Sequence, residues 1–133
     1  MVILIIMVMV ASLIPRASVT LAHSKVNRAA YVIAADFLYA QSLAARQHMP
    51  VAVQVRSDSL FLRITDVASG KVLRTDLFDK TSAFQLAALS ATPASAQVMP
   101  NAMATASMVV TVGGTDYYHL VRMTQAGQVR ITK

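Results

Sequence analysis

The chain has 133 residues, of which 56% are hydrophobic, and 12 basic and 6 acidic residues give it a net charge of +6. This length provides for one domain with one core. The absence of cysteine excludes a disulfide framework, a thiolate metal site and a thiol nucleophile. The basic balance is compatible with nucleic acid, anionic lipid or an acidic protein as a partner, and charge alone does not choose among them.

The first fifteen residues form an almost unbroken apolar run in which Ser12 is the polar exception before Pro15. As a helix, the residues before Pro15 would span about 21 Å, against roughly 30 Å for the hydrocarbon core of a bilayer. The run therefore predicts an incomplete membrane helix. A cleaved secretory signal is the alternative, although no basic segment precedes the run. A buried helix of a soluble domain is disfavoured because the run is apolar on every side.

After Pro15 the pattern becomes amphipathic and predicts a helix that continues to about Gln47. Pro15 need not end this helix, because membrane-proximal helices tolerate a proline kink. The helix is expected to stop near His48, because Met49 precedes Pro50 and is pushed out of the helical conformation. Apolar residues recur at three- and four-residue steps and mark one face of the helix: Val19, Ala22, Val26, Ala29, Ile33, Phe37, Ala40 and Ala44.

The period then changes to two, which predicts antiparallel strands. A two-residue loop at Ser57-Asp58 would place Val51, Val53 and Val55 opposite Leu60, Leu62 and Ile64 on one apolar face. A third strand is predicted at Val72–Phe78 and a fourth at Phe84–Leu89. The segment Ala87–Ser107 is rich in Ala, Ser and Thr and contains Pro93 and Pro100, so it predicts an irregular excursion.

Regular structure is predicted to resume at Met108–Val112, followed by a turn at Gly113–Asp116 and strands at Tyr117–Thr124 and Gln128–Lys133. The last two strands suit a three-residue loop, Gln125-Ala126-Gly127, with Gly127 in the left-handed conformation. That register sets Val121 and Met123 opposite Ile131 and Val129. It also sets Arg122 opposite Arg130 on the other face, where like charges are mildly destabilising. Screening by solvent is the plainest compensation, and a nearby Asp or a bound anion is the alternative.

Nothing in the sequence indicates catalysis. The histidines at 23, 48 and 119 have neither HxH nor HExxH spacing, and are predicted to be ordinary surface or half-buried residues rather than metal ligands. Gly113-Gly114 predicts a turn and not a phosphate loop, and no serine lies in a GxSxG elbow. Asp76 and Asp79 are expected to be solvated residues at a strand end. We therefore expect no enzyme, no metal, no cofactor and no small-molecule substrate.

Three stretches carry a resemblance to a known family. They are the apolar run that ends at Pro15, the helix tail and first strand (Arg28–Val55) and the terminal hairpin with its polar-Gly-basic turn (Val121–Lys133). In this order they resemble type IV pilins and type II secretion pseudopilins, most closely the GspH/FimT group of minor pseudopilins. The resemblance implies an α+β fold, in which a long N-terminal helix, apolar and then amphipathic, packs against a small antiparallel sheet. It divides the chain into a membrane or filament-core segment (residues 1–15), an amphipathic helix (16–48) and a sheet domain (49–133).

The resemblance implies a role in assembly, as a structural minor pseudopilin in the periplasmic pseudopilus of a type II secretion system. The chain would cross the bacterial inner membrane once, and its partners would be other pseudopilins or pilins, inner-membrane lipid and the assembly platform. Val19, Val26, Ile33 and Phe37 would hold the sheet domain to its own helix. The side chains assigned to membrane and filament are Val2, Ile3, Leu4, Ile5, Ile6, Val8, Val10, Leu13, Ile14 and Pro15.

The N-terminus of the chain differs from the family pattern. Family members begin with a basic leader, a Gly at the cleavage point, then a Phe and an apolar segment with a Glu near its start. This sequence has the apolar segment, but it has no such leader, Gly or Glu. We therefore expect Met1 to fall inside the membrane helix rather than at the true start. Two other functions stay open: a minor type IV pilin that contacts DNA through Arg122, Arg130 and Lys133, and a secreted all-β binding module released by cleavage soon after Pro15.

Overall fold

The computed structural model describes residues 2–114 and 116–133, and for residues 2–18 it describes the backbone alone. Within these residues the chain forms one helix, α1 (Val2–Gln47), and eight strands. The strands are β1 (Val51–Arg56), β2 (Phe61–Asp66), β3 (Val72–Leu77), β4 (Ala88–Thr92), β5 (Ser95–Val98), β6 (Met108–Gly113), β7 (Tyr118–Met123) and β8 (Val129–Thr132). The predicted α+β class, with a long N-terminal helix on antiparallel strands, is confirmed.

Helix α1 runs without interruption from Val2 to Gln47 and passes through Pro15. At 1.5 Å per residue it is about 70 Å long. It ends where the sequence predicted: His48 takes a left-handed φ of 53°, and Pro50 follows shortly after. Arg46 in the last turn places a positive charge at the negative end of the helix dipole.

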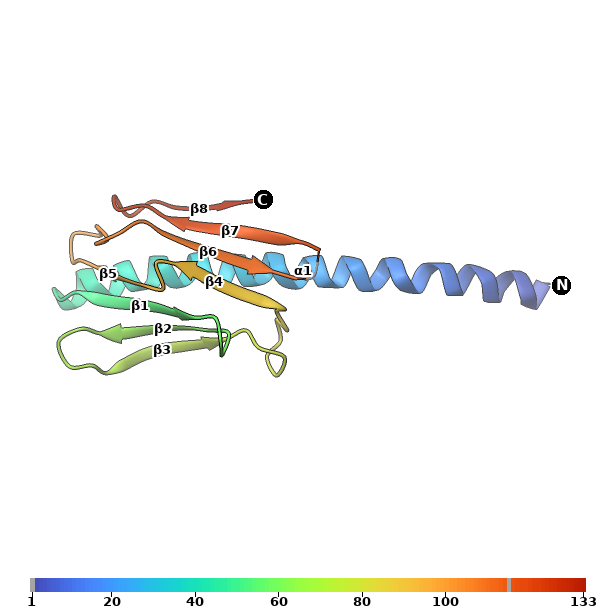
Figure 1. The fold of residues 1–133 in the computed structure, drawn as a ribbon, viewed down its shortest axis with the longest axis horizontal. Coiled ribbons are helices and arrows are strands. Elements are labelled where there is room, and N and C mark those ends of the chain that lie inside the picture. The colour runs from blue at the N-terminus through green and yellow to red at the C-terminus, as the bar shows by residue number, and fades with distance from the viewer. Residues whose placement is uncertain (1, 115) are drawn as a thin grey trace.

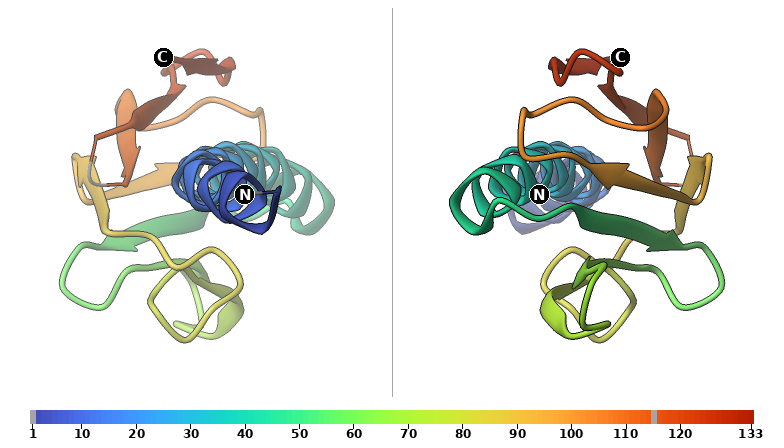
Figure 2. Two further views of the ribbon diagram at one scale, coloured as in Figure 1. Left: turned by 90° about the vertical axis from the view of Figure 1, so that its right-hand side faces the viewer. Right: turned by 90° about the vertical axis from the view of Figure 1, so that its left-hand side faces the viewer.

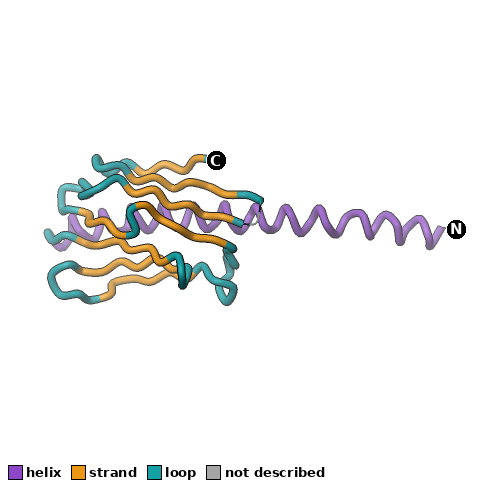
Figure 3. The backbone as a smooth tube through the Cα atoms, in the orientation of Figure 1, coloured by secondary structure: helices purple, strands orange, loops and turns teal. Residues whose placement is uncertain are grey.

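Two four-stranded antiparallel sheets cover the C-terminal half of α1, in the strand orders β3-β2-β1-β5 and β4-β6-β7-β8 (Figure 1). Seen along the helix, the strands curve around one side of it (Figure 2). The N-terminal part of the helix extends well beyond the strands (Figure 3). The sheets therefore leave the N-terminal part of α1 uncovered, and they cover the C-terminal half of α1 on one side only.

The core lies between α1 and the inner faces of both sheets. β1 shows the pattern plainly, because Val51, Val53 and Val55 are buried and the residues between them are more exposed. The largest fully buried side chains come from the helix and from both sheets: Phe37, Phe78, Ile33, Leu62, Ile64, Leu89, Met108, Met123, Val51, Val53, Val98 and Val110. Helix and strands therefore form one unit around a shared core.

The first hairpin has a longer loop than predicted. Val53 pairs with Ile64 and Val55 with Leu62, and the loop between β1 and β2 covers Ser57–Leu60. The two-residue loop and its register were therefore wrong by two residues. Ser57-Asp58 lacks the Asn-Gly or Asp-Gly chemistry of a tight turn. The inner face was still predicted correctly, because a slip of two residues returns each side chain to the same side of a sheet.

The segment predicted to be irregular contains two strands, so that prediction was wrong. β4 starts at Ala88, later than the predicted Phe84, and Phe84 instead packs on Phe78 with ring centroids 5.1 Å apart. β4 pairs with β6 and β5 pairs with β1, so the chain crosses from one sheet to the other between them. Their partners lie far away in the sequence, and the short Ala- and Ser-rich strands carry little periodicity of their own.

The terminal hairpin has the predicted register. Val121 pairs with Ile131, Met123 with Val129 and Arg122 with Arg130. Gly127 has a φ of 87°, as the three-residue loop requires. At the preceding turn, the Gly114 N–H donates to the Tyr117 carbonyl at 2.7 Å. The predicted turn at Gly113–Asp116 includes Thr115, which lies outside the described residues.

Candidate assembly surfaces

One face of α1 holds the sheets. Val26 is buried, and Ile33 and Phe37 have no exposed surface, in a cluster shared with the strands. Val19 is 55% exposed, so the prediction that it packs helix on sheet was wrong. The sheet ends too early for Val19 to be covered: a Cβ built on Gly114 would lie 3.7 Å from a methyl group of Val26, and Val19 is almost two turns nearer the N-terminus.

The opposite face of α1 is an exposed seam that the sequence reasoning missed. Its eight positions alternate in steps of three and four, and each of them is exposed: Leu21, Ser24, Arg28, Tyr31, Ala35, Leu38, Ser42 and Ala45. Leu21 is 62%, Tyr31 69% and Leu38 54% exposed. This period of 3.5 residues is the spacing by which one helix packs along another. The signal was visible as large apolar residues with helical spacing outside the predicted buried face.

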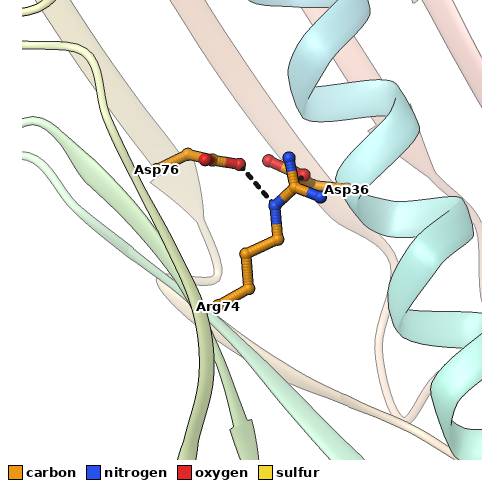
Figure 4. Close-up of polar contacts among 3 residues, drawn as sticks. All are labelled: Asp36, Arg74 and Asp76. Carbon is orange, nitrogen blue, oxygen red and sulfur yellow. Dashed lines mark hydrogen bonds and ion pairs between the residues drawn. The ribbon is translucent and has the colours of Figure 1, made fainter.

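A cluster of three charged residues joins this helix to the edge strand β3. Asp36 is 1% exposed, and its Oδ1 lies 3.2 Å from Arg74 Nε (Figure 4). The Nε–H group donates to Asp76 Oδ2 at 2.9 Å, so Asp36 takes part in an ion pair without a hydrogen bond. The guanidinium also lies 5.3 Å from the centroid of the Tyr39 ring. Asp76 is therefore a partly buried member of an ionic cluster, and its prediction as a solvated residue was wrong.

Burial, followed by the nearby carboxyl group of Asp76 and its negative charge, raises the pKa of Asp36 to about 8, whereas the positive charge of Arg74 opposes the shift. Asp36 is therefore mainly protonated at neutral pH. Asp79 follows the sequence prediction for a turn residue, since it accepts from Thr81 and Ser82 and the Thr81 hydroxyl lowers its pKa.

The three histidines occupy different environments. His119 is 4% exposed, and its Nε2 contacts the Tyr117 hydroxyl at 2.8 Å and also Asn27 Oδ1. His23 stacks on Tyr117 with ring centroids 4.1 Å apart, and His48 is exposed at the end of the helix. Within residues 2–114 and 116–133, no group of three potential ligands could hold a metal ion. His119 is more buried than predicted, because it ties β7 to the helix through Asn27.

The basic residues of the terminal hairpin are exposed to solvent. Arg122 and Arg130 are directly opposite each other on the exposed face, and Lys133 is exposed at the chain end. In the part of the chain that the structure describes, the ion pairs are those of Arg56 with Asp58 and of Arg74 with Asp36 and Asp76. No aspartate therefore compensates the two hairpin arginines within the described residues, and screening by solvent stays the plainest prediction.

The N-terminal segment was predicted to serve membrane and filament. Its side chains lie outside the described residues, so the assignments from Val2 to Pro15 stay predictions. In the portion of the chain available to this test, no helix has a stretch both long and apolar enough to cross a bilayer.

A long helix whose C-terminal half is wrapped by antiparallel strands defines a pilin-like fold. The chain is similar to the type IV minor pilin FimU of Pseudomonas aeruginosa strain PAO1 in two crystal forms. The alignment with one crystal form has a TM-score of 0.66 and 20% identity, and it covers 83% of this chain and 90% of the FimU chain. The alignment with the other crystal form has a TM-score of 0.62 and 22% identity, and it covers 80% of this chain and 92% of the FimU chain.

The chain is also similar to the minor pseudopilin EpsH of the type 2 secretion system of Vibrio cholerae, with a TM-score of 0.62 and 12% identity over 81% of this chain and 96% of that chain. No protein-family model matches the chain, and no curated protein matches it. At these identities the similarity shows the fold. The neighbours that share it are structural proteins and not enzymes.

Proposed function

We propose that this protein is a structural minor pseudopilin that assembles into the periplasmic pseudopilus of a type II secretion system. The observation that carries the proposal is the long helix, which protrudes beyond the sheets and, next to them, presents an exposed seam that includes Leu21, Tyr31 and Leu38. The similarity to a minor pilin and a minor pseudopilin supports it. On this proposal the partners are other pseudopilins or pilins, inner-membrane lipid and the assembly platform.

The physical reason lies in what the helix leaves uncovered. Residues 2–14 are apolar apart from Ser12, so this segment is stable in lipid or against other apolar helices and not in water. The protein would be anchored once in the bacterial inner membrane through this segment, with the sheet domain in the periplasm. When a subunit leaves the membrane, neighbouring helices replace the lipid. The seam continues the same helix into the domain and gives the next helix a surface to follow.

Replacing Leu38 by aspartate is expected to reduce incorporation into the filament by at least about tenfold, because burial of a leucine contributes about 1.5–3 kcal/mol and tenfold corresponds to 1.4 kcal/mol. The thermal midpoint of the isolated protein should barely change, since Leu38 is 54% exposed. The measurement is the amount of the protein in filaments sheared from the bacterium that produces it. Met103→Asp is the matched control, because Met103 is a similarly exposed apolar residue (50%) in the loop between β5 and β6 and lies outside the seam. Normal incorporation of the Leu38 variant would remove the seam from the proposed interface.

A second function is favoured by one observation, the two exposed arginines that lie opposite each other on the terminal hairpin. In this alternative the protein is a minor pilin of a type IV pilus, and Arg122, Arg130 and Lys133 contact the phosphates of DNA. Phosphate contacts by cations release counterions, so binding would weaken steeply with salt. The two functions share the fold and the helix and differ in whether DNA binds.

A gel shift with duplex DNA separates them. If the hairpin binds DNA, replacing Arg122 and Arg130 by alanine should reduce the slope of log affinity against log salt by about two, because each phosphate contact contributes about 0.9. The control exchanges two exposed arginines of the helix, Arg28 and Arg46, which should leave binding unchanged if the hairpin is the site. Absence of any shift at low salt would eliminate the alternative.

A further inference from the structure

The edge strand β3 is attached to the domain by few contacts other than its ladder to β2. None of its six residues is buried. It pairs on one side with β2, and the register shifts between Ile64 and Thr65. Apolar burial therefore contributes little to holding β3 in place, so the ladder to β2 and the charged side chains of β3 are its main attachments.

That interaction is charged and lies on the inner face of the sheet. Asp76 pairs with Leu62 and Arg74 with Ile64, and both partners are fully buried, so the two charged side chains point toward the helix. There they meet Asp36, which is buried in α1, as the close-up shows (Figure 4). Two carboxyl groups and one guanidinium thus share a site that is shielded from water on the helix side.

We propose that Asp36, Arg74 and Asp76 form a proton-dependent clasp that holds β3 against α1, and that loss of the proton on Asp36 releases the strand. With one proton, the cluster contains one carboxylate and one guanidinium and is neutral. Without it, two carboxylates face one guanidinium, and an uncompensated negative charge is buried, which is costly. Swinging β3 outward brings Asp36 into contact with water and removes that cost.

No other charge takes over the role of the proton. Among the described residues, the titratable and charged groups that act on Asp36 are Asp76 and Arg74 of β3, and Tyr39 of α1 contacts the same guanidinium. The buried residues of the helix and strands around this site are hydrophobic. Neither oxygen of Asp36 has a hydrogen-bond partner in the described part of the chain, so no hydrogen-bond donor there stabilises its charged form.

The direction of the pH effect follows from the two states of Asp36. With β3 in place its pKa is about 8, against a usual value of 3.8 for an exposed aspartate. The state with β3 in place therefore binds the proton more tightly than the state with β3 released. The stabilisation that this proton gives to the attached strand is complete below about pH 4 and is lost as the pH rises through 8. Between these limits the opening equilibrium should increase by up to about tenfold for each pH unit.

The test is hydrogen exchange of the full chain at pH 5 and pH 7, corrected for the intrinsic effect of pH on exchange. Protection of the β3 amides should fall by at least about tenfold between the two values, while the β7 amides of the same molecule keep their protection. Equal β3 protection at both pH values would overturn the proposal. A parallel loss in β7 would also overturn it, because the whole domain would then be opening.

Two variants test the assignment to this cluster. Asp36→Asn imitates the protonated carboxyl and should abolish the loss between pH 5 and pH 7. Asp76→Asn removes the second carboxylate but leaves Asp36 buried beside Arg74, so the response should be smaller than in the unmodified protein. Asp58→Asn changes an exposed loop carboxyl with 67% side-chain exposure and should behave as the unmodified protein does. A response that persists in both cluster variants would contradict the clasp.

Discussion

Replacing Phe37 by alanine is expected to lower the free energy of unfolding by about 3–5 kcal/mol. Phe37 has no exposed surface and is among the largest fully buried side chains. It lies on the helix face that both sheets cover, so its removal leaves a cavity where three layers meet. Native domains are stable by only about 5–15 kcal/mol, so this loss is a large share of the total. Thermal and urea unfolding of the full chain, followed by circular dichroism, measures it.

Leu38 provides the matched control for this core substitution. It is the next residue in the chain, is 54% exposed and lies on the outer seam. Its replacement by alanine should change stability by no more than about 0.5 kcal/mol. If both substitutions destabilised the domain equally, the division of α1 into a face for the sheets and a face for partners would be wrong. The pair therefore separates stability from assembly at adjacent positions.

The features that the sequence predicted correctly are local ones. The end of α1 follows from His48, Met49 and Pro50, because the residue before a proline avoids the helical conformation. The register of β7 and β8 follows from Gly127, because one glycine in a left-handed conformation sets the loop length and hence every pair beyond it. In each case a few residues that are close in the sequence determine the local conformation, so no contact with a distant segment is needed to predict it.

The features that it missed depend on contacts between distant segments. β4 and β5 became strands because β6 and β1 offered them free edges, which their own Ala- and Ser-rich composition does not reveal. The exposure of Val19 depends on how far the sheet extends along the helix, and helical periodicity carries no such information. The charged cluster depends on the register of β3, which brings Arg74 to an aspartate on a different element.

A second large effect is expected at the terminal hairpin, where Gly127→Ala should cost about 2–5 kcal/mol. Gly127 has a φ of 87°, and a Cβ added there would lie 2.3 Å from the carbonyl oxygen of Ala102. The left-handed conformation of a side-chain residue costs about 1–2 kcal/mol, and forced overpacking adds about 1–3 kcal/mol. The thermal midpoint should fall by roughly 10 °C.

The backbone around Gly127 has little freedom to yield, because three elements meet there. Its carbonyl accepts from Gln41 Nε2 of α1 at 2.7 Å, and its N–H donates to Thr124 O at 2.9 Å. On the other side, the N–H of Ala102 donates to Met99 O at 2.9 Å. Gly70→Ala is the control, since Gly70 has a φ of 70° and nothing lies within 4 Å of an added Cβ. It should lose only the conformational part, about 1 kcal/mol. Equal losses at the two glycines would mean that the segment around Ala102 moves aside, and its contact with the hairpin would then contribute nothing to fixing the loop.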